Sequence, residues 1–309
     1  YMGDLPSNRQ RLGTEYTDLI FAPALEHSLL RDELYCQIIR QLTENKIRLS
    51  EERGWELMWL ATGIMTCSTN VQKEIGQLLT SAKTPIAIDC LNRLNRTAKY
   101  GNRKYAPYIL EVEAIRFKSL QIFHKIYFPN DTDEAFEVHS STKTSSLCED
   151  IAERLKLNSS DGFSLFVKIS DKVFSVPHEY FFFDFIHELM EWMRKSRPSK
   201  SSEVTQVQYQ IFFMKKMWVN VHPGRDRNAD DIFYFHQELP KYLRGYHNCS
   251  KQDAIKLAAL IYRSKYGSVK DEISRIPDKL KEYVPADLLH VYRGGDWKKH
   301  ISTAYNQHS

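Results

Sequence analysis

One group of side chains has a spacing that could bind a metal ion. Asp226, Asn228 and Asp230 match the first three ligand positions of a calcium-binding loop. The sixth position of such a loop is glycine and the twelfth is a bidentate glutamate. This chain has Asp231 and Gln237 at those positions. We therefore expect no calcium site.

Motifs for enzymatic chemistry are missing from the sequence. It contains no P-loop for phosphate, no GxGxxG turn and no HExxH zinc pair. The eleven histidines are scattered, and His187 and His236 fall in helical segments. A histidine there is more often a partly buried group with satisfied hydrogen bonds than a metal ligand. The sequence predicts a protein that is not an enzyme and needs no cofactor or metal.

Basic residues between positions 93 and 104 form a run without a carboxylate. Its members are Arg93, Arg96, Lys99, Arg103 and Lys104. Residues three apart on a helix share a face. We therefore predict a docking surface for acidic partner segments, with microtubules among the candidates. The alternative is a solvated face, screened by Glu111 and Glu113 downstream.

A second basic group follows the last predicted strand, and it could contact anionic lipid headgroups. It consists of Lys215, Lys216, Arg225 and Arg227. Over the whole chain, 43 basic and 39 acidic residues give a net charge of +4. This near balance argues against a dedicated nucleic-acid-binding protein.

The length and the cysteines indicate the class of protein. A chain of 309 residues fits two or three domains. Its five cysteines contain no CxxC pair, so we predict reduced, buried thiols in a cytosolic protein. The sequence has no apolar run of about twenty residues that could span a membrane. Residues 1–4 also lack the apolar core of a signal peptide.

The first hundred residues have helical periodicity. Leu30, Leu34, Ile38 and Leu42 recur every four residues. A second helix is expected to begin at Ser50 as its N-cap, and it carries Trp55 and Trp59. Because this segment is apolar nearly all round, we predict a central buried helix with both tryptophans in the core. The connection 100–120 is too apolar for a flexible linker.

From residue 120 the pattern changes to that of strands. We expect strands at 121–128, 135–139, 163–170, 172–176 and from 207 onward. Ser146 and Glu149 have capping-box spacing before one helix, and another helix is expected over 182–195. Lys215-Lys216 predicts a break in the last strand, which Met217 then resumes. This order is that of a ubiquitin-like roll.

Beyond Pro223-Gly224 the chain becomes helical again. Gly245 is expected to end one helix, Ser250 to begin the next and Gly267 to end it. Residues 297–305 have the pattern of a helix without a packing partner. Residues 207–246 therefore join a sheet-containing module to a helical one.

Several of these segments resemble a known pair of domains. Residues 31–38, Arg-Asp-Glu-Leu-Tyr-Cys-Gln-Ile, followed by Arg53-Gly54-Trp55, resemble the signature of the myosin tail homology 4 (MyTH4) domain. Gln237, Leu243, Gly245, Cys249, residues 257–260 and Gly267 resemble the pattern of the helical lobe of a FERM domain. The pair is typical of unconventional myosin tails and some plant kinesins. Residues 122–125 and 238–247 resemble class VII myosins most, with class XV close behind.

The resemblance implies a multidomain α+β fold, in which an all-helical MyTH4 module precedes a FERM ubiquitin-like roll and a FERM helical-bundle lobe. The expected bounds are 1–116 for the MyTH4 module, 117–222 for the roll, 223–296 for the helical lobe and 297–309 for the start of a linker to a third lobe. The MyTH4 signature lies so near residue 1 that we expect part of that domain, like the third FERM lobe, to be absent.

The resemblance also implies a function. Myosin tails of this family bind scaffold and adaptor proteins as cargo, and they can fold back on their own motor domain. The expected location is the cytoplasm, at the cytoskeleton of actin-rich protrusions. Binding to anionic membranes or microtubules is the alternative.

Overall fold

The computed structural model describes residues 1–2, 14–196, 208–267, 269 and 271–307. The chain divides into two compact units, Tyr1–Val221 and His222–Ser309. The division lies next to the predicted boundary between roll and helical lobe. The predicted MyTH4 module and roll belong together to the first unit.

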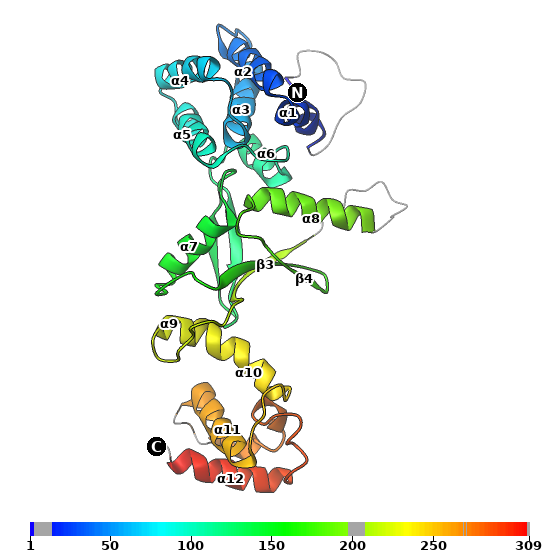
Figure 1. Cartoon of the computed structure of the whole chain (residues 1–309), viewed down its shortest axis with the longest axis vertical. Coiled ribbons are helices and arrows are strands. Elements are labelled where there is room, and N and C mark those ends of the chain that lie inside the picture. Colours follow the sequence, from blue (N-terminus) through cyan, green and yellow to red (C-terminus); the bar gives the residue numbers. More distant parts are fainter. Residues whose placement is uncertain (3–13, 197–207, 268, 270, 308–309) are drawn as a thin grey trace. The chain divides into compact units, whose positions relative to one another are not determined.

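The first unit begins with a bundle of helices (Figure 1). They are α1 (Glu15–Glu26), α2 (Ser28–Leu42), α3 (Arg48–Ile64), α4 (Thr69–Ala82), α5 (Pro85–Tyr100) and α6 (Ile109–Arg116). The predicted central helix is α3, whose second half is buried from Leu57 to Ile64. Trp59 is fully enclosed, as predicted, whereas Trp55 is only half-buried. Ser50 lies inside α3 and is not its N-cap, because the helix begins two residues earlier.

The connection between the helical bundle and the sheet is itself packed. Ala106, Tyr108, Val112 and Ile115 are buried, and the stretch contains α6. Burial of these side chains fixes the backbone of the connection. The prediction that this segment is not a flexible linker is confirmed.

The sheet of the first unit follows α6. Its strands are β1 (Phe123–Tyr127), β2 (Asp133–Glu137), β3 (Phe163–Ile169), β4 (Lys172–Ser175) and β5 (Gln210–Lys215). Among the described residues they are ordered β2-β1-β5-β3-β4. β1 and β5 are parallel and the other neighbours antiparallel. This mixed sheet agrees with the predicted roll.

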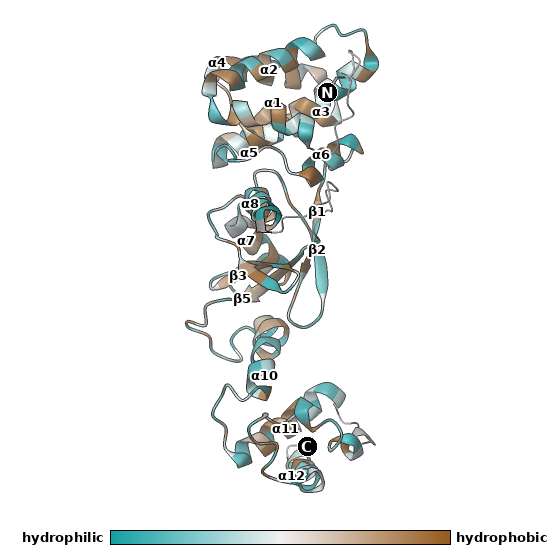
Figure 2. Cartoon of the chain, turned by 90° about the vertical axis from the view of Figure 1, so that its right-hand side faces the viewer, coloured by the Kyte–Doolittle hydropathy of each residue, from teal (hydrophilic) through white to brown (hydrophobic). Residues whose placement is uncertain are grey.

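Alternation along the strands gives the sheet a buried and an open face. Ile126, Leu165 and Phe213 are buried, and α7 (Thr144–Arg154) adds Leu147 and Ile151 to the core. On the solvent side, β2 is hydrophilic along most of its length (Figure 2). The helix α8 (Phe182–Ser196) connects β4 to β5.

Two local predictions for the roll were wrong. The helix α7 begins at Thr144, two residues before the expected cap at Ser146. The last strand does not resume after Lys215, because the amides of Lys216 and Met217 both donate to the carbonyl of Gly162 and the chain turns away. The predicted break at the lysine pair is confirmed.

The second unit is helical. It contains α9 (Arg227–Ala229), a π-helical turn η1 (Asp230–Tyr234), α10 (Phe235–Leu243), α11 (Lys251–Tyr266), the short 3₁₀ turns η2 (Asp271–Arg275) and η3 (Leu280–Glu282), and α12 (Gly294–Gln307). Ser250 caps α11, since its hydroxyl accepts from the amide of Asp253 at 3.1 Å. Gly245 and Gly267 follow α10 and α11 with positive φ, as predicted.

The described part of the segment 297–309, which ends at residue 307, is a packed helix and not the start of a linker. Trp297, Ile301 and Tyr305 of α12 are buried in the core of the second unit. The ring of Tyr305 packs edge-on against Tyr262 of α11, with 5.4 Å between centroids. The tail helix therefore has a packing partner inside its own unit.

Candidate functional site

Arg103, predicted to contact partners, lies inside the first unit. Its Nη1 is 2.8 Å from Glu111 of α6, and its Nε is 2.8 Å from Asp184 of α8. All three side chains are buried. A planar guanidinium can bond two carboxylates at once. Arg103 therefore ties the helical bundle to the sheet-bearing part of the unit.

The neighbours of Arg103 extend this connection to the surface. The amide of Lys104 donates to Asp184 at 2.8 Å, and its ammonium lies 2.7 Å from Glu188. The hydroxyl of Tyr105 also donates to Glu188, and its ring stacks on His187 at 4.4 Å. The Lys104 hydrogen bond lowers the pKa of Glu188. These contacts fix the start of α8 against residues 103–105.

Arg93 is also buried, with 3% of its surface exposed. Its guanidinium lies 3.5 Å from the ring centroid of Trp59, and its Nε donates to the Trp59 carbonyl at 3.0 Å. Its Nη2 donates to Ser140 at 2.6 Å. A Cβ at Gly63 would lie 2.2 Å from Nη2, so only glycine leaves room for this arginine.

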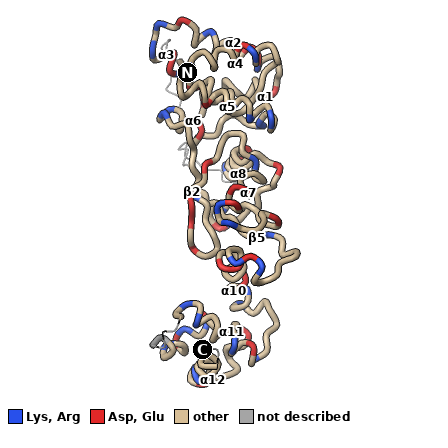
Figure 3. Tube along the Cα trace, turned by 90° about the vertical axis from the view of Figure 1, so that its left-hand side faces the viewer, with Lys and Arg blue, Asp and Glu red and all other residues tan. Residues whose placement is uncertain are grey.

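The prediction that the five basic residues share one solvent-exposed face is therefore wrong. Arg93 belongs to the buried stripe of α5, together with Cys90, Leu94 and Thr97. In Figure 3 basic and acidic segments are interspersed in both units. The members of the run that remain exposed are Lys99 and the paired Lys104, while Arg96 is half-buried.

The second basic group is divided between the two units. Lys215 is buried, with its ammonium 2.7 Å from the Asp161 carbonyl and 4.5 Å from the ring centroid of Phe163. Lys216 is exposed and donates to the Ser175 hydroxyl at 2.8 Å. In the second unit Arg225 and Arg227 are exposed. The prediction of an exposed lipid contact is wrong for Lys215, because its ammonium is used inside the roll.

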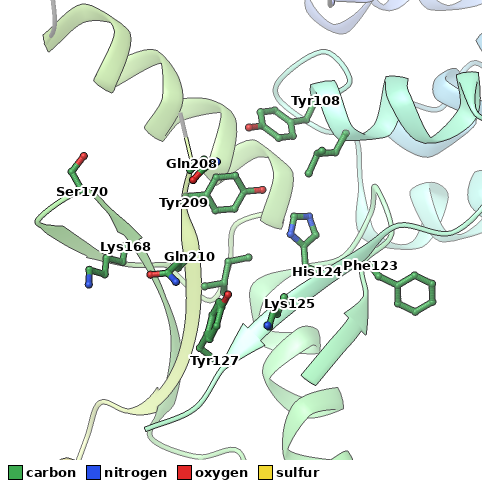
Figure 4. Close-up of a pocket in the computed structure, with 12 residues that line it drawn as sticks. Tyr108, Phe123, His124, Lys125, Tyr127, Lys168, Ser170, Gln208, Tyr209 and Gln210 are labelled. Atoms are coloured by element: carbon green, nitrogen blue, oxygen red, sulfur yellow. The ribbon is translucent and has the colours of Figure 1, made fainter. Parts of the chain in front are cut away.

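A groove of about 570 Å³ opens between β1 and β5 in the first unit (Figure 4). Its lining residues are Tyr108, Leu110, Phe123, His124, Lys125, Tyr127, Lys168, Ser170, Gln208, Tyr209, Gln210 and Ile211. The set combines an aromatic and aliphatic wall with two lysines and contains no carboxylate. A concave surface with an apolar wall and a few polar groups is a candidate binding site. None of the basic residues predicted from the sequence lines it.

Two polar groups stand at the back of the groove. The side chains of His124 and Tyr209 lie near one another between the strands (Figure 4), with 6.2 Å between ring centroids. His124 Nε2 and the Tyr209 hydroxyl are enclosed and have no hydrogen-bond partner among the described residues. Burial lowers the pKa of His124 to about 4. The imidazole is therefore neutral at physiological pH.

We expect this histidine to make the first unit sensitive to acid. The unfolded chain binds a proton at His124 near pH 6.5, whereas the folded chain does so only near pH 4. The neutral His124 therefore costs no stability above pH 6.5. Between pH 6.5 and about 4 the unfolded chain binds this proton and the folded chain does not, so the free energy of unfolding falls. At pH 4.5 the loss is about 2–3 kcal/mol. Urea unfolding of the wild type and of His124→Gln at pH 7 and 4.5 measures it.

The matched control is His178→Gln, at an exposed histidine of the same unit. This variant should retain the full acid dependence of the wild type, whereas His124→Gln should lose a large part of it. An equal acid dependence in His124→Gln and the wild type would contradict the assignment.

Asp226 and Asp230, which match ligand positions of a calcium loop, bond to backbone amides in this structure. The Asp226 carboxylate accepts from the amide of Ala229 at 3.0 Å, and that of Asp230 from the amide of Gly224 at 2.7 Å. No cluster of potential metal ligands occurs within the described ranges.

Cys90 and Cys148 are buried, but Cys36 is exposed, so the prediction of buried thiols holds only in part. No described helix is long and apolar enough to cross a membrane.

Family models cover most of the chain. The model of the MyTH4 domain matches residues 17–114, that of an RA-like domain residues 120–217 and that of the FERM central domain residues 231–309. The RA-like match falls on the predicted ubiquitin-like roll.

Known proteins extend this similarity over nearly the full length of the chain. Myosin-VIIa of Drosophila melanogaster is 55% identical over 99% of this chain. Human unconventional myosin-XV is 24% identical over 98% of it. The chain spans 14% and 9% of those two proteins.

A solved structure also matches. It is the human Myosin 7b C-terminal MyTH4-FERM domain in complex with the harmonin-a PDZ3 domain, with 46% identity and a TM-score of 0.89. The match covers 100% of this chain and 63% of that one. The resemblance predicted from the sequence is confirmed.

Proposed function

We propose that this chain, which belongs to the MyTH4–FERM tail regions of unconventional myosins and is similar to those of class VII, is a non-catalytic partner-binding region. It would link a myosin motor to scaffold or adaptor proteins at the actin cytoskeleton. The motor and its activity lie outside the 14% of the Drosophila relative that this chain spans. Folding back on that motor would be a second use of the same region.

The observation that carries this proposal is the similarity to the Myosin 7b tail domain. That domain is in complex with a PDZ domain of harmonin-a, and it is 46% identical over the whole of this chain. The groove between β1 and β5 gives further support, because it is an open concave surface that the core of the unit does not fill. Residues 117–222 and 223–296 would be the first two FERM lobes.

The membrane and microtubule alternatives have weaker support. Both require a dense group of solvent-exposed cations. Arg93, Arg103 and Lys215 are instead bonded inside the first unit. Exposed lysines and arginines remain, but no group of them matches the predicted surfaces.

Isothermal titration of the purified chain with the harmonin-a PDZ3 domain tests the proposal. We expect saturable binding of one PDZ domain per chain. Pelleting of the chain with phosphatidylserine liposomes and with microtubules, at low and high salt, is the parallel measurement. Screening by salt weakens contacts between exposed charges, so salt-sensitive pelleting would indicate binding through a charged surface. Such pelleting in the absence of PDZ binding would contradict the proposal.

A further inference from the structure

We propose that the groove between β1 and β5 receives an extended acidic segment of a partner protein, which adds to β1 as an extra strand. This inference rests on the proposed partner-binding function and specifies its site and the chemistry of its ligand. Three features of the groove carry it: the backbone of β1, the charge at the rim and the alternation of the lining side chains.

The first feature is an incomplete strand pairing. Among the described residues, β1 pairs with β5 only at Ile126↔Ile211 and Tyr127↔Phe212. Toward its start, β1 diverges from β5, and the groove occupies the space between them (Figure 4). In the part of the chain that the structure describes, Phe123, His124 and Lys125 therefore pair with β2 alone.

The direction of the main-chain groups follows from the hydrogen bonds to β2. The amide of Val138 donates to the Ile122 carbonyl, and the amide of Phe128 donates to the Thr132 carbonyl. Bonds in an antiparallel pair alternate from residue to residue, so even-numbered residues of β1 bond to β2. The amides of Phe123 and Lys125 then face the groove. An extended peptide can use such a strand edge as its template.

The second feature is the charge at the rim. Lys125 and Lys168 are exposed, and none of the described aspartates and glutamates lines the groove. Lys125 lies 3.0 Å from Asp133, with both side chains partly in solvent. Lys168 makes no ion pair with any described residue. A peptide carrying carboxylates complements both ammonium groups.

The third feature is the alternation of the lining. Phe123, Lys125 and Tyr127 point to the open face of the sheet, whereas His124 and Ile126 point to the buried face. At the start of β5 and just before it, Gln208 and Gln210 share the open side, and Tyr209 and Ile211 the inner side. A strand inserted between them would place alternate side chains beside the lysines and beside the inner wall. The complementary pattern is an acidic residue alternating with an apolar one.

Fluorescence anisotropy with a labelled peptide of alternating glutamate and valine tests the charge argument. The chain should bind this peptide and bind an alternating lysine–valine peptide much more weakly. Lys125→Glu combined with Lys168→Glu should weaken binding roughly tenfold or more, because each attraction to a carboxylate is replaced by repulsion. Lys172→Glu, at an exposed lysine of neighbouring β4 that does not line the groove, is the control and should bind like the wild type.

Phe123→Pro tests strand addition, because proline removes the amide that faces the groove and is tolerated as the first residue of a strand. Its binding should be several-fold weaker than that of Phe123→Ala, which loses the ring but keeps the amide. Circular dichroism checks that both variants fold. If Phe123→Pro does not fold, the lysine variants decide the question alone.

A parallel titration with the harmonin-a PDZ3 domain separates this inference from the proposed function. Binding of the PDZ domain without binding of the acidic peptide would overturn the groove proposal and leave the function standing. Peptide binding that is equal in the wild type and the double lysine variant would also overturn it. Loss of peptide binding in that variant only, with Lys172→Glu unchanged, is the result expected.

Discussion

Replacing Arg103 with methionine should destabilise the first unit by about 3–5 kcal/mol. The guanidinium is enclosed between Glu111 and Asp184 at 2.8 Å from each. Methionine keeps much of the side-chain volume but leaves two buried carboxylates without their cation. Urea unfolding followed by circular dichroism at pH 7 measures the loss.

The matched control is Lys104→Met, which removes the next cation along the chain. Its ammonium pairs with Glu188 in solvent, where ion pairs contribute little. We expect an unfolding midpoint close to that of the wild type. Equal midpoints for Arg103→Met and Lys104→Met would contradict the structural role assigned to Arg103.

Trp59→Ala should also cost about 3–5 kcal/mol, because it empties a large buried site. The indole is fully enclosed, donates from Nε1 to Asp89 at 2.6 Å and lies under the guanidinium of Arg93. Removing it takes the indole donor from Asp89 and the ring from beneath Arg93, which keeps its bonds to the carbonyl of residue 59 and to Ser140. Unfolding in urea, followed by circular dichroism, measures the loss without relying on the tryptophan signal.

Trp55→Ala is the comparison, one helical turn earlier on α3 and only half-buried. Trp55→Ala should lower the free energy of unfolding clearly less than Trp59→Ala does. A Trp59→Ala protein with unchanged stability, or one that loses no more than Trp55→Ala, would count against the central position of Trp59.

Local pattern was sufficient to predict most of the elements. Period-two alternation located β1, β3 and β5, and helical spacing identified α3 as the central helix of the bundle. Element ends were less certain, since the start of α7 depends on contacts with residues 178–180 that lie far along the chain. The packing of α12 does not follow from local pattern, because its contact with α11 joins Tyr262 to Tyr305, about forty positions away.

The buried arginines show where reasoning from charge fails. Arg103 and Asp184 are 81 residues apart, so nothing near Arg103 in the sequence indicates its partner. Arg93 did carry a usable signal, because Cys90, Leu94 and Thr97 place it on the apolar stripe of α5. The groove could not be predicted, since it depends on where β1 and β5 separate.

We infer that the charged residues between the helical bundle and the sheet hold residues 14–196 and 208–221 together as one folded unit. Limited proteolysis of the whole chain, with the cut sites identified by mass spectrometry, is the measurement that tests this. We predict that no early cut falls within residues 100–120, and that early cuts appear there in Arg103→Met. Early cleavage of the wild-type chain between Pro107 and Arg116, giving two stable fragments, would contradict the claim.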